Sequence, residues 1–480
     1  MQERAWWMAC LCFAGCLTPA CATAQGQGEV DVEALVKQVQ ELAEANRALT
    51  ERVVELENRL AESEQPPAPQ APTEQAAQAD AAAARVALRT YWDDGLRFET
   101  PDQAFRLKIG GRVMFDAGFF DSPNYWSLGG AEIDEHDGTE VRRLRLNFSG
   151  QIYGDYLYEV EVGFADDEPD VIDAYVGMKG VPVLGTLRAG QFSEPLGLEA
   201  LTSANHLTFL ERSMPTQAFV PYRSRGLGFS NQFLDKRLTL AGGVFNGGVD
   251  QDNHWNVTAR LTGTPWYANE GRRVLHLGVG WSHRNPESEY GFYARPGSHL
   301  ANKHLNTGEL PADEVDLRGA EAALVLGPFS IQGEFLRADV DFLPEPRDLT
   351  IFDLDRFFTL EDRHFDGYYV QASYFLTGEH RVYDPATACF DRVVPRNRFR
   401  LRGGTWGAWE VAARYDELGL DDFDVRSGVI GGEGHNLTLG LNWYLTPNVR
   451  LMMNYVKSHV DQFAYEGDID IWQTRFQADF

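Results

Sequence analysis

The sequence predicts an all-β protein: an antiparallel transmembrane β-barrel of about sixteen strands, preceded by an N-terminal α-helical coiled coil. Three observations predict this fold. Apolar and polar side chains alternate beyond residue 85, the chain stops on Phe480, and a heptad pattern occupies residues 29–63. With 44% hydrophobic residues, 12% aromatic residues and 46 glycines, the composition favours strands and turns over helices.

The first residues have the form of a signal peptide. Arg4 precedes an apolar stretch that ends at Leu17, and Ala22-Thr23-Ala24 offers the small side chains that signal peptidase requires. The apolar stretch is too short to cross roughly 30 Å of hydrocarbon as a helix. We therefore expect residues 1–24 to be removed. Lipid attachment at Cys16, which ends a lipobox-like Phe-Ala-Gly-Cys, is the alternative.

Residues 29–63 carry a heptad pattern that predicts a coiled coil. Charged residues surround the apolar seam on all sides, which favours association with another copy over docking on a core. Valine at a, leucine at d and a single asparagine at a favour a two-stranded parallel coil. The a positions are Val32, Val39, Asn46, Val53 and Leu60, and the d positions are Leu35, Leu42, Leu49 and Leu56. Residues 64–85, rich in proline and alanine, follow as an extended linker.

A two-residue period begins after the linker and predicts the barrel, residues 86–480. In the last segment Trp472, Phe476 and Phe480 alternate with polar residues, and outer-membrane barrels end in such a strand. We predict strands near 103–119, 139–152, 154–165, 170–180, 184–192, 225–233, 236–246, 254–267, 272–284, 317–326, 328–340, 364–377, 404–415, 433–446, 448–459 and 469–480.

An even number of strands suits a closed antiparallel barrel, and about sixteen strands enclose an aqueous lumen. Tight turns are expected at Gly154-Asp155, Leu234-Asp235 and Thr446-Pro447, and long loops at 285–316, 341–363 and 378–403. Short connections on one side and long ones on the other are typical of outer-membrane proteins. A soluble β-sandwich or propeller is the weaker alternative, because the strands are long and aromatic residues lie near their ends. We place Trp406, Trp409, Trp443, Tyr444 and Tyr455 in such an interfacial girdle.

Charge and cysteine content exclude other classes of function. A formal net charge of −28 argues against a nucleic-acid partner, because phosphate backbones are bound through clustered lysine and arginine. Four of the five cysteines fall in the signal segment, so Cys389 can form neither a disulfide nor a thiolate metal cluster within one mature chain. The eleven histidines are scattered and no catalytic motif occurs. We therefore expect no catalytic residue, metal or cofactor.

The segment 191–224 is too long for a turn, and a loop at this position would fold into the lumen. Here the chain resembles the phosphate-selective porin O and P family, over residues 140–230 in particular. The resemblance is carried by Arg142-Arg143, Asp173-Ala174-Tyr175, the stretch from Gly190 to Glu199 and Glu211-Arg212-Ser213. It implies a homotrimer of sixteen-stranded channels with a basic constriction that selects phosphate or polyphosphate.

The alternation of side chains supports part of this independently, because it directs several basic residues into the lumen. Guanidinium groups bind phosphate oxygens and release them again, as a permeation pathway requires. Arg142 has outward parity, so its role is implied by the resemblance alone. Arg212, Arg223 and Arg225 are expected to add charge from the constriction loop. The expected solute pathway consists of Arg106, Lys108, Arg112, Arg142, Arg143, Arg145, Asp173, Arg188, Arg212, Arg223 and Arg225.

The expected function is therefore an outer-membrane porin, not an enzyme, that passes small anions such as phosphate. Carboxylates on the same rows, Glu159, Glu161 and Asp173, leave a weakly selective general porin as one alternative. A barrel that anchors the coiled coil as an interaction module is another. Expected partners are outer-membrane lipid, lipopolysaccharide, two further copies of the chain and, through a periplasmic coil, peptidoglycan or another periplasmic partner.

Overall fold

The computed structural model describes residues 37, 40, 44, 45, 47–56, 88–127, 135–165, 168–246, 254–287, 289–343, 363–424 and 427–480. The expected signal peptide and linker lie outside the described residues. So does most of the expected coiled coil. Residues 47–56 are helical, and the side chains of Leu49, Val53 and Leu56 are exposed in the single chain. None of the described helices has the length and hydrophobicity needed to cross a membrane.

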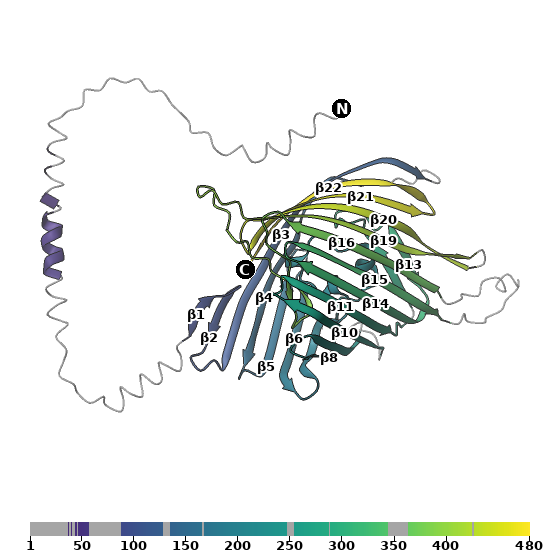
Figure 1. The fold of residues 1–480 in the computed structure, drawn as a ribbon, viewed down its shortest axis with the longest axis horizontal. Helices are drawn as coiled ribbons and strands as arrows, with labels where there is room; N and C mark the ends of the chain where they lie inside the picture. The colour runs from purple at the N-terminus through teal and green to yellow at the C-terminus, as the bar shows by residue number, and fades with distance from the viewer. Residues whose placement is uncertain are drawn as a thin grey trace, which may run out of the picture. The chain divides into compact units, whose positions relative to one another are not determined.

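The described part of the chain beyond residue 100 forms a closed barrel of sixteen antiparallel strands (Figure 1). Each strand pairs with its neighbour in the barrel, and the last strand pairs with the first. The barrel strands are β3 (Phe105–Ser127), β4 (Gly138–Ile152), β5 (Tyr156–Gly163), β6 (Asp170–Val181), β7 (Gly185–Ser193), β8 (Arg223–Phe233), β9 (Leu238–Asn246), β10 (Trp255–Ala268), β11 (Arg273–Arg284), β14 (Ala312–Leu326), β15 (Phe329–Phe342), β16 (Arg363–Phe375), β19 (Ala408–Asp424), β20 (Ser427–Tyr444), β21 (Val449–Gln462) and β22 (Tyr465–Asp479).

The barrel closes where β22 pairs with β3, in a register that runs from Tyr465 opposite Ser127 to Asp479 opposite Arg112. The rest of β3 pairs with a small hairpin made of β1 (Arg89–Trp92) and β2 (Leu96–Glu99). Phe480 ends the chain beside Gly111, where the two residues exchange backbone hydrogen bonds of 2.8 and 2.9 Å. A Cβ on Gly111 would lie 2.7 Å from the Phe480 ring, so this glycine makes room for the terminal aromatic.

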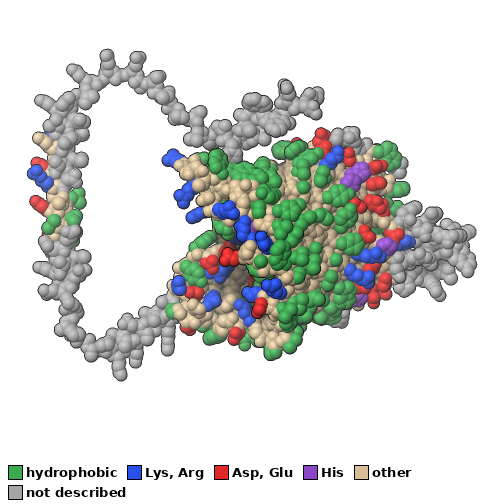
Figure 2. Space-filling view, in the orientation of Figure 1, with side chains coloured by type: hydrophobic (Ala, Val, Ile, Leu, Met, Phe, Trp, Pro, Cys, Tyr) green, Lys and Arg blue, Asp and Glu red, His purple; other side chains and the backbone are tan. Residues whose placement is uncertain are grey.

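The expected alternation is confirmed, since one row of each strand is apolar and exposed on the outside of the barrel. On β20, for example, Leu437 and Leu439 are exposed, whereas their neighbours Asn436 and Thr438 are buried inside the barrel. Figure 2 shows the hydrophobic side chains covering the outer wall of the barrel. Tyr444 departs from the expected girdle, because it points inward and donates a 2.8 Å hydrogen bond to Glu410.

Connections at one end of the barrel are mostly short, as predicted. The β4–β5 turn places Tyr153 and Gly154 at positive φ, the backbone geometry that tight hairpin turns favour. One expectation is wrong: the long segment 376–407 joins β16 to β19 at this short-turn end and not among the long loops. The length of a connection does not show which end of the barrel it lies on, but the strand count does: the predicted strand 364–377 is the twelfth, and the connections after even-numbered strands all lie at the end of the β4–β5 turn.

Three long connections pack inside the barrel. The 194–222 loop contains α4 (Leu198–Leu201), the 3-10 helix η1 (Ala204–His206) and α5 (Met214–Phe219). The 285–311 loop contains β12 (Tyr290–Ala294) and β13 (Leu305–Leu310), and the 376–407 segment contains β17 (Val382–Asp384) and β18 (Cys389–Asp391). An apolar core joins the 194–222 loop and the 285–311 loop to the inner rows of β14–β22. Leu196, Phe219, Phe292 and Leu336 are among its buried residues.

Candidate functional site

A β-bulge between β3 and β4 sets the position of two arginines. The register of the pair shifts between Met114, which faces Arg143, and Phe115, which faces Val141. The extra residue turns Arg142 inward together with Arg143, because a bulge interrupts the alternation of side chains. The outward parity expected for Arg142 is therefore wrong.

Both arginines contact Glu211 of the 194–222 loop. Arg142 donates two hydrogen bonds to the Glu211 carboxylate, of 2.9 and 3.1 Å, and Arg143 lies 3.9 Å from the same group. From β22, Arg475 donates to Glu211 at 2.7 Å and to the Leu210 carbonyl oxygen at 2.5 Å. Burial raises the pKa of Glu211, but the three guanidinium groups hold it well below its usual range. The ionised Glu211 carboxylate thus links the 194–222 loop to the barrel wall. Its contacts with Arg142, Arg143 and Arg475 are here called the clamp.

Arg475 also binds the β3 residue Asp116 through two short contacts, of 2.7 and 2.6 Å. Its side chain is completely buried. A guanidinium group with five donors can serve two carboxylates and a carbonyl oxygen at once, which a lysine cannot do in this geometry. The 194–222 loop is therefore fixed at the junction of the first and last barrel strands.

Arg212 stabilises the loop itself. Its guanidinium group donates to the carbonyl oxygens of Glu199, Ala200 and Thr202 at 2.9–3.1 Å and stacks on the Tyr222 ring, 5.6 Å from the centroid. These carbonyls lie at the C-terminal end of α4, where backbone acceptors have no partner within the helix. The contacts of Arg212 therefore stabilise the loop. The sequence had led us to expect that this side chain contacts the solute.

The inner wall below the clamp carries basic and acidic groups in contact. Arg112 and Arg145 share one carboxylate, Glu161, at 2.9 and 2.8 Å. Arg223 forms a two-pronged pair with Asp173 at 3.0–3.1 Å. Glu159 accepts hydrogen bonds from Tyr175 and Asn147 at 2.6 and 2.7 Å.

The carboxylates of Glu159, Glu161 and Asp173 lie within 4.8 Å of one another, close enough to hold a cation. Arginines already neutralise two of these three groups, as the distances above show. The guanidinium groups of Arg112, Arg145 and Arg223 at these carboxylates would repel a metal ion. The arrangement therefore fits a permeation wall of alternating charge better than a metal site.

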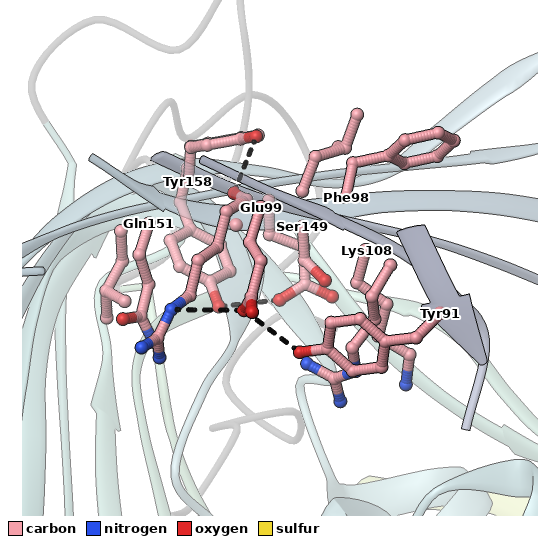
Figure 3. A pocket seen from close by; sticks show the side chains of 14 residues that line it. Tyr91, Phe98, Glu99, Lys108, Ser149, Gln151 and Tyr158 are labelled. Carbon is pink, nitrogen blue, oxygen red and sulfur yellow. Dashed lines mark hydrogen bonds and ion pairs between the residues drawn. The ribbon is translucent and has the colours of Figure 1, made fainter. Parts of the chain in front are cut away.

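A cavity of about 280 Å³ opens on the lumen where the β1–β2 hairpin meets the inner rows of β3–β6 (Figure 3). Glu99 lies at its centre, where it accepts a 3.1 Å hydrogen bond from Tyr91 and lies 4.0 Å from Arg106. Lys108 pairs with Asp94 at 2.8 Å. Both basic residues lie on the inner row of β3, and each has an acidic neighbour that the sequence did not indicate.

Arg188 and Arg225 differ from the other expected pathway residues. No ion pair of Arg188 is found among the described residues, and its guanidinium group stacks 5.3 Å from the centroid of Tyr175. Arg225 occupies the same row of β8 as Leu227, whose side chain is 66% exposed on the outer wall. Arg223 and Arg225 also belong to β8 and not to the constriction loop. The inward position expected for Arg225 is therefore wrong.

The inner rows of β10–β22 are covered by the long connections. Arg260 pairs with Glu321 at 2.6 Å, and His276 bridges Glu321 and Tyr383 of the 376–407 segment at 3.1 and 2.7 Å. Arg381, on the same segment, donates to the carbonyl oxygen of His206 and to the Thr208 hydroxyl in the 194–222 loop, at 3.1 and 2.6 Å. The segment and the loop thus meet inside the barrel.

Sequence reasoning missed the arginines of the covered wall. Arg414 pairs with Asp416 at 3.0 Å and with Glu199 of the loop at 3.3 Å, and its side chain is 1% exposed. Arg450 donates to the Leu207 carbonyl oxygen at 2.7 Å. The signal was present, because Arg414, Arg450 and Arg475 all occupy the polar row of their strands.

The comparison with known families is decisive at this point. The family model described as phosphate-selective porin O and P matches residues 107–480. The chain belongs to the phosphate-selective porin O and P family. The family resemblance expected from the constriction loop is thereby confirmed, and the match extends over the whole barrel.

Two relatives and one solved structure illustrate the breadth of the likeness. Porin O of Pseudomonas aeruginosa is 28% identical over 426 residues, which are 80% of this chain and 91% of that protein. An uncharacterised protein of Caulobacter vibrioides is 29% identical over 93% of this chain and 89% of its own length. The outer-membrane channel DcaP of Acinetobacter baumannii shares the fold, with 11% identity, a TM-score of 0.50, and coverage of 80% of this chain and 99% of DcaP.

This protein is thus an outer-membrane porin with a closed barrel of transmembrane strands. Its short-turn end faces the periplasm and its long-loop end the exterior, as in other outer-membrane barrels. Porins of this family are channels, which is consistent with the expectation that the chain is not an enzyme.

Proposed function

We propose that this porin passes small anionic solutes, phosphate among them, by diffusion along the inner wall formed by β3–β8. The single observation that carries the proposal is the sharing of carboxylates by arginines on that wall. Arg112 and Arg145 share Glu161, and Arg142 and Arg143 of the same wall surround Glu211 together with Arg475 of β22. Shared acceptors leave a surplus of guanidinium charge facing the pathway, which favours anions.

The same ion pairs argue for modest selectivity. An arginine that already binds a carboxylate offers a passing phosphate fewer free donors, so each solute contact is weak. Glu159 also adds negative charge to the wall, since its partners Tyr175 and Asn147 are neutral. We therefore propose a preference for anions without tight phosphate binding, between the phosphate-selective channel and the general porin expected from the sequence.

Planar-bilayer recordings of the full chain test the proposal. In a KCl gradient the reversal potential should show that chloride is more permeant than potassium. Arg188→Gln should lower that preference, because Arg188 is an inward arginine for which the described residues provide no carboxylate. Arg225→Gln is the matched control, since Arg225 lies on the outer row. A cation-preferring or strictly neutral channel would rule out the proposed function.

The phosphate concentration that blocks chloride current distinguishes a weakly selective anion channel from a phosphate-selective porin. For a weakly selective anion channel, phosphate should reduce chloride current only at millimolar concentration. A block at micromolar concentration would instead establish a phosphate-selective porin. Arg142→Gln should change such a block more than Arg212→Gln, because the guanidinium group of Arg212 is occupied by backbone carbonyls.

We propose further that the porin is a homotrimer and that residues 29–63 form a coiled coil in the periplasm, in contact with peptidoglycan or another partner. The exposed apolar side chains of helix 47–56 support a coil, because such a row is normally covered by another helix. Chemical cross-linking of the full chain, compared with a chain that lacks residues 29–63, tests both statements. If the chain without residues 29–63 still forms trimers, the barrel itself holds the three copies together.

A further inference from the structure

A basic hairpin projects from the periplasmic end of the barrel, at the end of the 376–407 segment. Residues 396–406, here called the arginine hairpin, contain Arg396, Arg398, Arg400 and Arg402 and no acidic residue. The chain as a whole carries a formal net charge of −28, so this concentration of positive charge is exceptional. Figure 1 draws the segment as a loop that extends past the strand ends near the C-terminus, and Figure 2 shows lysine and arginine side chains gathered at that end.

The hairpin has a defined structure. Arg400 and Thr405 form an antiparallel bridge, and Gly403 and Gly404 close the turn, with Gly404 at a φ of 68°. The Thr405 hydroxyl donates a 2.7 Å hydrogen bond to the Arg398 carbonyl oxygen. The tip residue Leu401 is 88% exposed. An ordered turn therefore presents three arginines and one leucine to the surroundings.

Of the four arginines in the hairpin, only Arg396 has a side chain that hydrogen-bonds to the described part of the chain. Arg396 donates to the carbonyl oxygens of Thr377 and Gly378, at 3.4 and 2.6 Å, and so fixes the base of the hairpin. For Arg398, Arg400 and Arg402 the described part of the chain provides no ion pair, and all three are exposed. Their guanidinium groups are available to an external anion.

Aromatic residues attach the hairpin to the lipid-facing side of the wall. Phe399 lies edge-on to Trp443, with ring centroids 5.0 Å apart, and Trp443 stacks on Trp409 at the same distance. Trp443 also donates a 2.7 Å hydrogen bond to the carbonyl oxygen of Trp406, which is itself 65% exposed. Trp409 and Trp443 continue the outer rows of Val411 and Leu441, which face the acyl chains. Tryptophan at strand ends marks the level of the lipid headgroups.

We propose that the arginine hairpin is a binding site for anionic phospholipid headgroups in the periplasmic leaflet of the outer membrane. Its position, at the headgroup level on the outer wall, directs its charges toward lipid phosphates and away from the lumen. Arginine binds phosphate oxygens in pairs, and the exposed leucine and tryptophan insert beside the acyl chains. The site is separate from the solute pathway, which follows the inner wall of β3–β8.

Lipid binding to the full chain in non-ionic detergent tests the proposal, with cardiolipin, phosphatidylglycerol and phosphatidylethanolamine as probes and native mass spectrometry as the readout. The wild type should retain the two anionic lipids in preference to phosphatidylethanolamine. Because each arginine near an anionic surface strengthens binding about fivefold, Arg398→Gln, Arg400→Gln and Arg402→Gln combined should weaken binding of the anionic lipids roughly 100-fold. High salt should weaken binding in the wild type as well.

The matched control removes three positive charges from other exposed positions at the same end, by Lys179→Gln, Lys236→Gln and Arg237→Gln. This control should bind the anionic lipids as the wild type does. Equal binding by the hairpin variant and the wild type, or equal retention of all three lipids, overturns the proposal. Displacement of the lipid by millimolar inorganic phosphate also overturns it, because the site would then belong to a free anion. So does a hairpin variant whose only defect is a weaker trimer, which would assign the hairpin to a neighbouring copy.

Discussion

The two inner walls of the barrel carry similar polar residues in very different surroundings. On β3–β8, Arg106, Lys108 and Arg112 keep 42%, 25% and 15% of their side chains exposed. On β10–β22, Arg414 and Arg475 are at most 1% exposed, because the 194–222 loop packs against them. An inward arginine is thus a pore-lining group on one wall and part of a packed interior on the other.

The largest effect should follow from removing a charge on the covered wall. Arg475→Met leaves Asp116 buried without its cationic partner, which costs about 3–5 kcal/mol of stability. The temperature at which the barrel unfolds in a heat-modifiability gel should fall clearly. Lys108→Gln on the open wall should cost less than about 1 kcal/mol, because its partner Asp94 keeps 45% of its side chain exposed to water. Equal losses for the two variants would contradict the difference between the walls.

Removal of the segment inside the lumen should change the conductance of the channel. If residues 381–391 are replaced by a short glycine-serine linker, single-channel conductance should rise severalfold, because β17, β18 and Arg381 no longer occupy the lumen. Arg260 and His276 would then be solvated by water. Shortening the hairpin tip at residues 400–404 is the control and should leave conductance unchanged. An unaltered conductance in the first variant would show that the pathway avoids this part of the lumen.

The clamp at Glu211 should persist in mild acid. Its pKa is held well below the usual range, so its contribution to stability is complete above the unfolded-state pKa of about 4.3 and is lost only as pH falls through the lower folded value. Open-channel noise recorded in bilayers should therefore stay constant from neutral pH down to about pH 4.3. A transition in noise between those values would assign the clamp to another group. Glu211→Gln should be noisy at every pH.

The smallest effect concerns Cys389, which lies buried in the 376–407 segment. Burial raises the pKa of its thiol to about 11, so little thiolate is present at neutral pH. Maleimide labelling of the folded porin should be slow, with no change in channel function. Tyr383→Ala, which removes a neighbouring buried ring, should accelerate labelling. Rapid labelling of the wild type would indicate that the segment leaves the lumen frequently.

The sequence predicted the strands well and the site only in part. All sixteen predicted strands correspond to barrel strands, because alternation is a local signal that each strand carries by itself. The inward direction of Arg106 and Arg145 follows from the same signal. Arg142 does not, since a bulge reverses parity without a mark in the pattern. Nor could alternation show that loops cover Arg414, because burial of a lumen row depends on residues some 200 positions away, such as Glu199.

The position of Arg475 links two events that are usually considered separately. This arginine belongs to β22, and its guanidinium group binds two carboxylates, Asp116 of β3 and Glu211 of the 194–222 loop. The guanidinium group reaches both partners only when the sheet has become a cylinder. The 194–222 loop therefore reaches its fixed position in the same step that closes the barrel wall.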